Sequence, residues 1–150
     1  MTNTNYKTIA SKIKFEGRAF INGKYVDAID GAKFETINPA TGETLCSVAK
    51  CNSKDVDLAV KVSRKAFNSG VWSRTSPEFR KDVLLKFAEL LRTHGEENSV
   101  LECIDTGKLI GDCINEVAND APMHFQWYGE LIDKVFGKVG PTEPSLTSLI

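Results

Sequence analysis

The spacing of apolar residues changes once along this chain, close to residue 53, and that change limits what the chain can fold into. Before it, apolar and polar residues alternate in short runs separated by turn signals, which is typical of strands. Asn22-Gly23 is the clearest of these signals, because both residues tolerate the positive φ angles of a two-residue hairpin turn. We therefore expect strands at about 18–22 and 24–28.

A second strand region follows, in the sequence KFETINPATGETLCSVAK. Pro39 pushes the residue before it out of helical conformation, and Thr41-Gly42 closes a turn. The stretch TLCSVAK then alternates as a short strand, with Leu45 and Val48 expected to face inward. Together these patterns predict hairpins over 18–48.

From residue 53 on, apolar residues recur every three or four positions, as in helices. The expected helices cover 53–70, 76–95, 96–104 and a long segment at about 111–137. Ser53 and Ser76 would cap the first two, and Gly70 and Gly95 would end them. Pro122 predicts a kink or restart in the long segment. The positions expected to be buried are Val56, Ala59, Val60, Ala66 and Phe67 in the first helix, Val83, Leu84, Phe87, Leu90 and Leu91 in the second, and Val100, Leu101 and Ile104 in the third.

The stretch DTGKLIG, residues 105–111, contains a Thr-Gly-Lys that suggests a phosphate-binding loop. Such a loop requires Gly, four residues, and then Gly-Lys-Ser/Thr after a strand. Here Glu102 takes the place of the first glycine, Leu109 replaces the metal-binding hydroxyl, and the preceding segment is helical. We therefore reject a nucleotide site and interpret Gly107 as a helix-ending residue in the left-handed region.

Composition excludes several classes of partner. The net charge is −1 and basic residues are interleaved with acidic ones, so neither nucleic acid nor an anionic membrane is expected as a partner. No run of 18 apolar residues and no signal core is present, and the four cysteines lack zinc-ligand spacing. Reduced thiols and a cytoplasmic location are therefore expected.

Several stretches, taken in order, resemble the N-terminal part of NAD-dependent aldehyde dehydrogenases. They are FINGKYVDA, FETINPATGE, SKDVDLAVKVSRKAFNSGVW, SPEFRKDVLLKFAELL, LECIDTGKLI and FQWYGELIDKVFGKV, and the resemblance covers about residues 15–150. Each is weak alone, whereas the ordered set is specific. The last stretch is most similar to the branch acting on γ-glutamyl-γ-aminobutyraldehyde and related amino-aldehydes.

This resemblance implies an α/β fold that is incomplete here: β-hairpins, a helical segment, and the start of an oligomerisation strand. It divides the chain into a flexible extension at 1–14, part of the NAD-binding domain at 15–140 (hairpins 18–48, helices 53–137), and a linker with the first part of the strand at 141–150. The family's nucleophilic cysteine and catalytic glutamate would lie beyond residue 150. None of Cys46, Cys51, Cys103 and Cys113 occurs in that cysteine's motif, so we expect no catalytic or cofactor-binding residue in this chain.

The resemblance also implies a few site residues. In many members a Na, K or Mg cation is held by a backbone carbonyl and an aspartate, which correspond to Ile37 and Asp105. The alternative for Asp105 is a turn cap without metal. Asp120 lies in the segment that lines the substrate entrance, where a carboxylate would attract the ammonium group of an amino-aldehyde. The alternative is an ordinary solvated carboxylate.

Two functions remain open at this point. In the first, the chain is the N-terminal fragment of a homo-oligomeric enzyme, a dimer or tetramer, that oxidises an aldehyde with NAD; the fragment by itself would be inactive. In the second, it is a non-catalytic α/β interaction module that assembles with a partner subunit. Because SLTSLI would form an unpaired apolar edge, we also expect the isolated chain to be poorly soluble.

Overall fold

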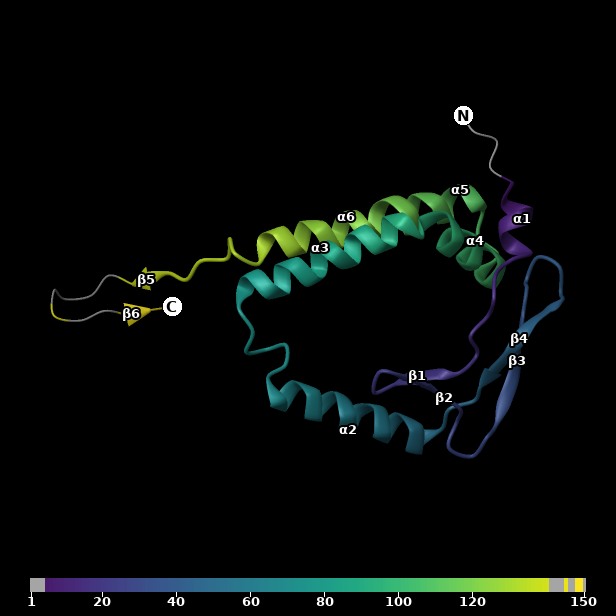
Figure 1. Cartoon of the computed structure of the whole chain (residues 1–150), viewed down its shortest axis with the longest axis horizontal. Coiled ribbons are helices and arrows are strands. Elements are labelled where there is room, and N and C mark those ends of the chain that lie inside the picture. The colour runs from purple at the N-terminus through teal and green to yellow at the C-terminus, as the bar shows by residue number, and fades with distance from the viewer. Residues whose placement is uncertain (1–4, 141–144, 146–147, 150) are drawn as a thin grey trace.

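A computed structural model describes residues 5–140, 145 and 148–149. The helices are α1 Tyr6–Ala10, α2 Ser53–Ser69, α3 Pro77–Thr93, α4 Gly95–Thr106, α5 Ile110–Cys113, the π-helix η1 Ile114–Asp120, and α6 Ala121–Leu131. The strands are β1 Ala19–Ile21, β2 Lys24–Val26, β3 Lys33–Ile37, β4 Thr44–Ala49, β5 Val139–Gly140 and β6 Ser148–Leu149. They pair as three separate antiparallel hairpins (Figure 1).

The first hairpin is the one that Asn22-Gly23 predicts. Phe20 lies opposite Tyr25 in the register of β1 and β2, and the two turn residues have φ angles of 55° and 75°. These left-handed angles are those of a two-residue turn whose twist matches the strands. The Phe20 and Tyr25 rings meet edge to face with centroids 5.1 Å apart.

The second hairpin, β3–β4, carries a register shift between Thr36 and Ile37. Its turn is closed by the Gly42 N–H, which donates to the Asn38 carbonyl at 2.8 Å, and Gly42 has a φ of 75°. The chain before β1 runs beside this hairpin, because the Ala49 N–H donates to the Gly17 carbonyl at 2.7 Å. The local turn chemistry of the sequence therefore predicts both hairpins correctly.

Helix α2 begins at Ser53, but its cap is Asn52, not Ser53 as the sequence suggested. The Asn52 side chain accepts from the Lys54 N–H, and the Asp55 carboxylate accepts from the Asn52 N–H, which forms a capping box. Asn52 is preferred because its extended backbone points the amide oxygen at the first free N–H groups of the helix. The helix ends at Gly70, as predicted, with a φ of 79°.

Helix α3 has the predicted Ser76 cap followed by Pro77. Its expected last residue, Gly95, instead starts α4, and His94 links the two helices. Gly95 is required at a helix crossing, because a Cβ atom there would lie 2.8 Å from the Cβ of Ala118 in η1. The glycine therefore serves close packing and not helix termination.

The long helix expected at 111–137 is divided into α5, η1 and α6, and it ends at Leu131. Pro122 supplies the physical reason for the π-helix. It has no N–H to donate four residues back, and its ring crowds the carbonyl of Ala118. The backbone widens to a five-residue spacing just before it, so that the Ala121 N–H donates to the Glu116 carbonyl.

Helix α6 runs antiparallel along α3, while α2 lies apart from this pair (Figure 1). The buried core is thin: among the described residues its apolar side chains are Ala28, Ala49, Ala88, Val100, Cys113 and Pro122. Most residues of the predicted inner faces are exposed, among them Val60 at 61%, Phe67 at 59% and Leu90 at 46%. The accessible surface is 11376 Å², whereas a compact protein of 16.5 kDa exposes about 7,500 Å². These helices therefore present apolar faces that the described residues do not cover.

Candidate functional site

The end of α4 contacts the β3–β4 hairpin, and this contact brings the two residues of the expected cation site into one region. The Thr36 hydroxyl donates to the Asp105 carboxylate at 3.3 Å, and Ile37 is the next residue along β3. The approach is close, since a Cβ on Gly107 would lie 2.8 Å from the Pro39 ring. Residues almost seventy positions apart in the sequence thus meet at one corner of the molecule.

The chemistry of this corner suits a hard cation, which prefers oxygen ligands. Asp105 is exposed, and the register shift beside Ile37 disrupts the β ladder there. The pKa of the neighbouring Cys46 thiol is raised, first by burial and then by the charges of Glu35 and Asp105. A higher pKa disfavours the thiolate form of Cys46, which is the form that binds metals. Among the described residues there is no cluster of three or more His, Cys, Asp or Glu that could hold a metal.

The stretch at 105–111 is a helix end, as predicted, and not a phosphate loop. Gly107 has a φ of 76°, and its N–H donates to the Cys103 carbonyl. The Lys108 N–H, just after this helix end, donates to the hydroxyl of Thr106 at 3.3 Å and not to the carboxylate of Asp105. Asp105 is thus bonded to Thr36 and does not cap this turn.

Asp120 is the last residue of η1 and is exposed. Its carbonyl accepts a hydrogen bond from Nδ1 of His124 at 2.8 Å. This bond fixes the backbone at the junction of η1 and α6, just before the buried Pro122. Tyr128 follows one turn later and is 60% exposed. The segment expected at the substrate entrance therefore has one side-chain-to-backbone hydrogen bond directly at Asp120.

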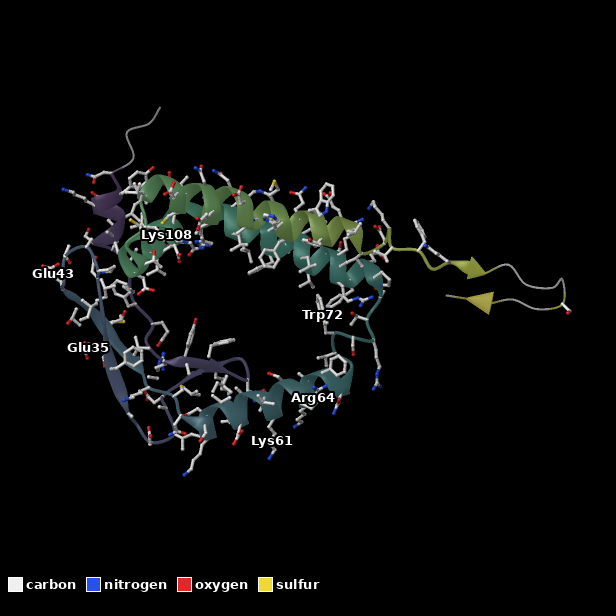
Figure 2. The ribbon with its side chains drawn as sticks, turned by 180° about the vertical axis from the view of Figure 1, so that it is seen from behind. Glu35, Glu43, Lys61, Arg64, Trp72 and Lys108 are labelled. Carbon is white, nitrogen blue, oxygen red and sulfur yellow. The ribbon has the colours of Figure 1, made fainter. Side chains whose placement is uncertain are left out.

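Lys108 lies next to this region, and no pattern in the sequence marks it as a site residue. Its ammonium group lies 2.6 Å from a Glu116 oxygen and 3.4 Å from a Glu102 oxygen. These two hydrogen bonds, Glu116 first, raise the pKa of Lys108 above its ordinary value. In Figure 2 Lys108 lies at the end of the helical layer, next to the hairpin that carries Glu35 and Glu43. Glu102 and Glu116 stand six and eight positions from Lys108, which lies between α4 and α5, so the i,i+3 and i,i+4 contacts within one helix do not predict these pairs.

A second ion pair joins the far ends of α3 and α6. Lys81 lies 2.9 Å from Asp133, whose other oxygen lies 2.8 Å from Lys134. The hydrogen bonds from Lys134 and Lys81 lower the pKa of Asp133 to about 2. This exposed pair links the first turns of α3 to the residues that follow α6, away from Asp105 and Asp120.

Among the described residues, the connection from β4 to α2 does not fit the pyrophosphate of a dinucleotide. Within 5–140 a strand leads into a helix at 50–52, and this connection contains no glycine. A pyrophosphate-binding turn requires glycines for close backbone approach. The first turn of α2 also carries the buried carboxylate of Asp55, which would repel a phosphate.

Comparison with known proteins identifies the family of this chain. The profile of the aldehyde dehydrogenase family matches residues 25–150. The chain belongs to the aldehyde dehydrogenase family. It is 37% identical over 150 residues to an aminoacetaldehyde dehydrogenase of Pseudomonas aeruginosa. The alignment covers all of this chain and 30% of that protein.

Solved aldehyde dehydrogenase structures share the fold. The γ-glutamyl-γ-aminobutyraldehyde dehydrogenase of Burkholderia cenocepacia superposes with a TM-score of 0.91 at 42% identity, over 96% of this chain and 29% of that one. The indole-3-acetaldehyde dehydrogenase of Pseudomonas syringae, solved with NAD+, gives 0.91 at 39% identity with the same coverage. The expected fold class is thus confirmed: the chain is an N-terminal segment of the aldehyde dehydrogenase fold, and it spans about 30% of the length of these relatives. Among the described residues, none of the helices has the length and apolar character needed to cross a membrane.

Proposed function

We propose that this chain contributes the N-terminal segment of an enzyme that oxidises an amino-aldehyde to a carboxylic acid with NAD as the oxidant. The family match over residues 25–150 carries the proposal. Relatives named for amino-aldehydes and a neighbour solved with NAD+ support the substrate class and the oxidant. Because the connection from β4 to α2 does not fit a pyrophosphate, we assign NAD binding to polypeptide other than the described residues. A homo-oligomer and a cytoplasmic location stay predictions.

Within this enzyme we assign Asp120 to the substrate entrance. Its carboxylate is exposed at the end of η1, and its backbone is held by His124. An exposed carboxylate attracts a cation over several ångströms but gives no advantage to a neutral aldehyde.

The test is Asp120→Asn in the catalytically competent protein that contains this segment. KM for an ammonium-bearing aldehyde should rise about three- to tenfold, with KM for a neutral aldehyde of the same length unchanged. Asp112→Asn, which removes another exposed carboxylate from the same helical segment, is the matched control. Equal effects of Asp120→Asn on both substrates would refute the assignment.

We also propose that Asp105 and the carbonyl of Ile37 hold a Na, K or Mg cation. The Thr36–Asp105 contact supports this, because it brings the carboxylate to the strand that carries Ile37. The proposal predicts that the chloride salt of Na, K or Mg raises the melting temperature more than choline chloride does at equal ionic strength. Calorimetry measures this. Asp105→Asn should abolish the difference, whereas a difference that survives this change would place the cation elsewhere.

A specific observation favours the second candidate function, a non-catalytic module. Large apolar side chains on α2 and α3 are exposed, and such surfaces are typical of segments that pack against other polypeptide. The two functions differ in a direct measurement: purification from the native source gives either one long chain with dehydrogenase activity or a 16.5 kDa chain within a mixed complex.

A further inference from the structure

Every polar group of Lys108 has a partner, and together these partners join α4 to η1. Its ammonium group pairs with the two glutamates. Its backbone N–H donates to the Thr106 hydroxyl at 3.3 Å, and its backbone carbonyl accepts from the Cys103 thiol at 3.1 Å. Glu102 and Cys103 belong to the last turns of α4, whereas Glu116 is in the first turn of η1. Lys108 therefore spans the corner at which the chain reverses between these elements.

Glu116 connects Lys108 to the expected substrate entrance. Its side chain meets the ammonium group at 2.6 Å, and its carbonyl accepts from the N–H of Ala121, the residue after Asp120. The Asp120 carbonyl is held in turn by His124. A short series of contacts thus leads from Lys108 through one turn of η1 to Asp120.

The π-helix η1 has one contact at each of its ends that comes from outside its own ladder. A π-helix is rare, and it occurs mostly as a single turn inside an α-helix, frequently at a functional site. Pro122 accounts for the widening at the C-terminal side of η1. At the N-terminal side, Lys108 supplies a contact from a residue outside the helical run.

We propose that Lys108 is a positioning residue that fixes η1 against α4 and thereby sets the place of Asp120 at the substrate entrance. The consequence for substrates rests on the proposed function, whereas the consequence for η1 does not. Lys108 touches neither substrate nor cofactor in this role.

The test uses two single variants of opposite charge effect, Lys108→Met and Glu116→Gln, in the catalytically competent protein that contains this segment. Each removes one side of the 2.6 Å pair. Hydrogen exchange of the amides at 114–121 should become about three- to fivefold faster in both, the upper part of the range for exposed ion pairs. The double variant should be no faster than either single one, because the same contact is lost.

The kinetic measurement distinguishes positioning from a plain charge effect. Loss of a positive charge at Lys108 strengthens the local attraction for a cation, and loss of a negative charge at Glu116 weakens it. A charge effect therefore moves KM for an ammonium-bearing aldehyde in opposite directions. Positioning raises KM about three- to fivefold in both variants, leaves kcat unchanged, and spares a neutral aldehyde.

Two further variants complete the experiment. Lys108→Arg keeps the positive charge and a side chain of similar length. It should therefore leave hydrogen exchange at 114–121 and KM close to those of the unsubstituted protein. Lys86→Met, which breaks the exposed 2.7 Å pair with Glu89 on α3, is the matched control and should change neither. Unchanged exchange at 114–121 in Lys108→Met, or KM shifts of opposite sign in the two single variants, would overturn the proposal. If Asp120→Asn proves unselective while exchange responds as expected, the entrance assignment fails and the support of η1 by Lys108 stands.

Discussion

At the scale of single residues, the most informative side chain is the buried carboxylate of Asp55, which is 2% exposed. Its oxygens accept from the N–H of Ile29 and the N–H of Asn52, each at 2.9 Å. A buried carboxylate is tolerated only when its hydrogen bonds are satisfied, as they are here. The sequence placed Asp55 in the first turn of a helix for its charge. It could not show that the same side chain also ties the loop after β2 to that helix, since Ile29 is 26 positions away.

Asp55→Ala should lower the free energy of unfolding by about 2–4 kcal/mol, because two part-buried N–H groups lose a charged acceptor. Urea denaturation measures this. Asp57→Ala, at an exposed position on the same helix, should change stability by less than about 0.5 kcal/mol. Similar losses in the two variants would show that the carboxylate acts through helix charge and not through its buried hydrogen bonds.

At the scale of elements, helix boundaries follow local chemistry and helix contacts do not. Ser76, Gly70 and Gly107 act at the ends of helices where the sequence predicted them. Gly95 was wrongly expected to end α3. Where α4 crosses η1, its first residue must lack a side chain, and no local pattern distinguishes that requirement from a helix stop. The π-helix was missed for a similar reason, since Pro122 predicts a disruption but not its form.

The crossing of α4 with η1 at Gly95 leads to a prediction that a second glycine, Gly111, controls. Gly95→Ala should destabilise the chain by about 1–3 kcal/mol, because the new methyl group would lie 2.8 Å from Ala118 and force the helices apart. Gly111→Ala, at a helical position with nothing within 4 Å, should be neutral or stabilising by about 0.5–1 kcal/mol. Thermal denaturation of both variants checks this, and equal melting temperatures would contradict the crossing.

At the scale of the whole molecule, the described residues build an open arrangement. The α3–α6 pair and α2 present apolar side chains that nothing within the described residues covers, and Figure 2 shows Lys61 and Arg64 on α2 at a distance from that pair. The relatives supply an explanation, since about 70% of their length has no counterpart in this chain. The inner faces predicted from helical periodicity are therefore real faces that are not buried here. Their periodicity is set by the sequence, but their burial requires other polypeptide.

An association measurement on the 150-residue chain tests this view. Replacing Val60 and Phe67 by lysine removes two exposed apolar side chains and should weaken self-association by about tenfold or more, measured by sedimentation. The control adds the same two charges at Ser63 and Asn68, exposed polar positions of α2. If the control weakens association equally, net charge governs it and the apolar face does not.

By itself the sequence determined the features that depend on near neighbours: the hairpin at Asn22-Gly23, the Ser76 cap, the left-handed helix ends at Gly70 and Gly107, and the family resemblance carried by the ordered motifs. These are local because φ and ψ preferences and capping bonds act within a few residues. Only the tertiary structure decided that Asp105 meets Thr36 and that Lys108 joins α4 to η1. Such contacts connect residues that are brought together by packing, and packing depends on the shape of all surrounding elements at once.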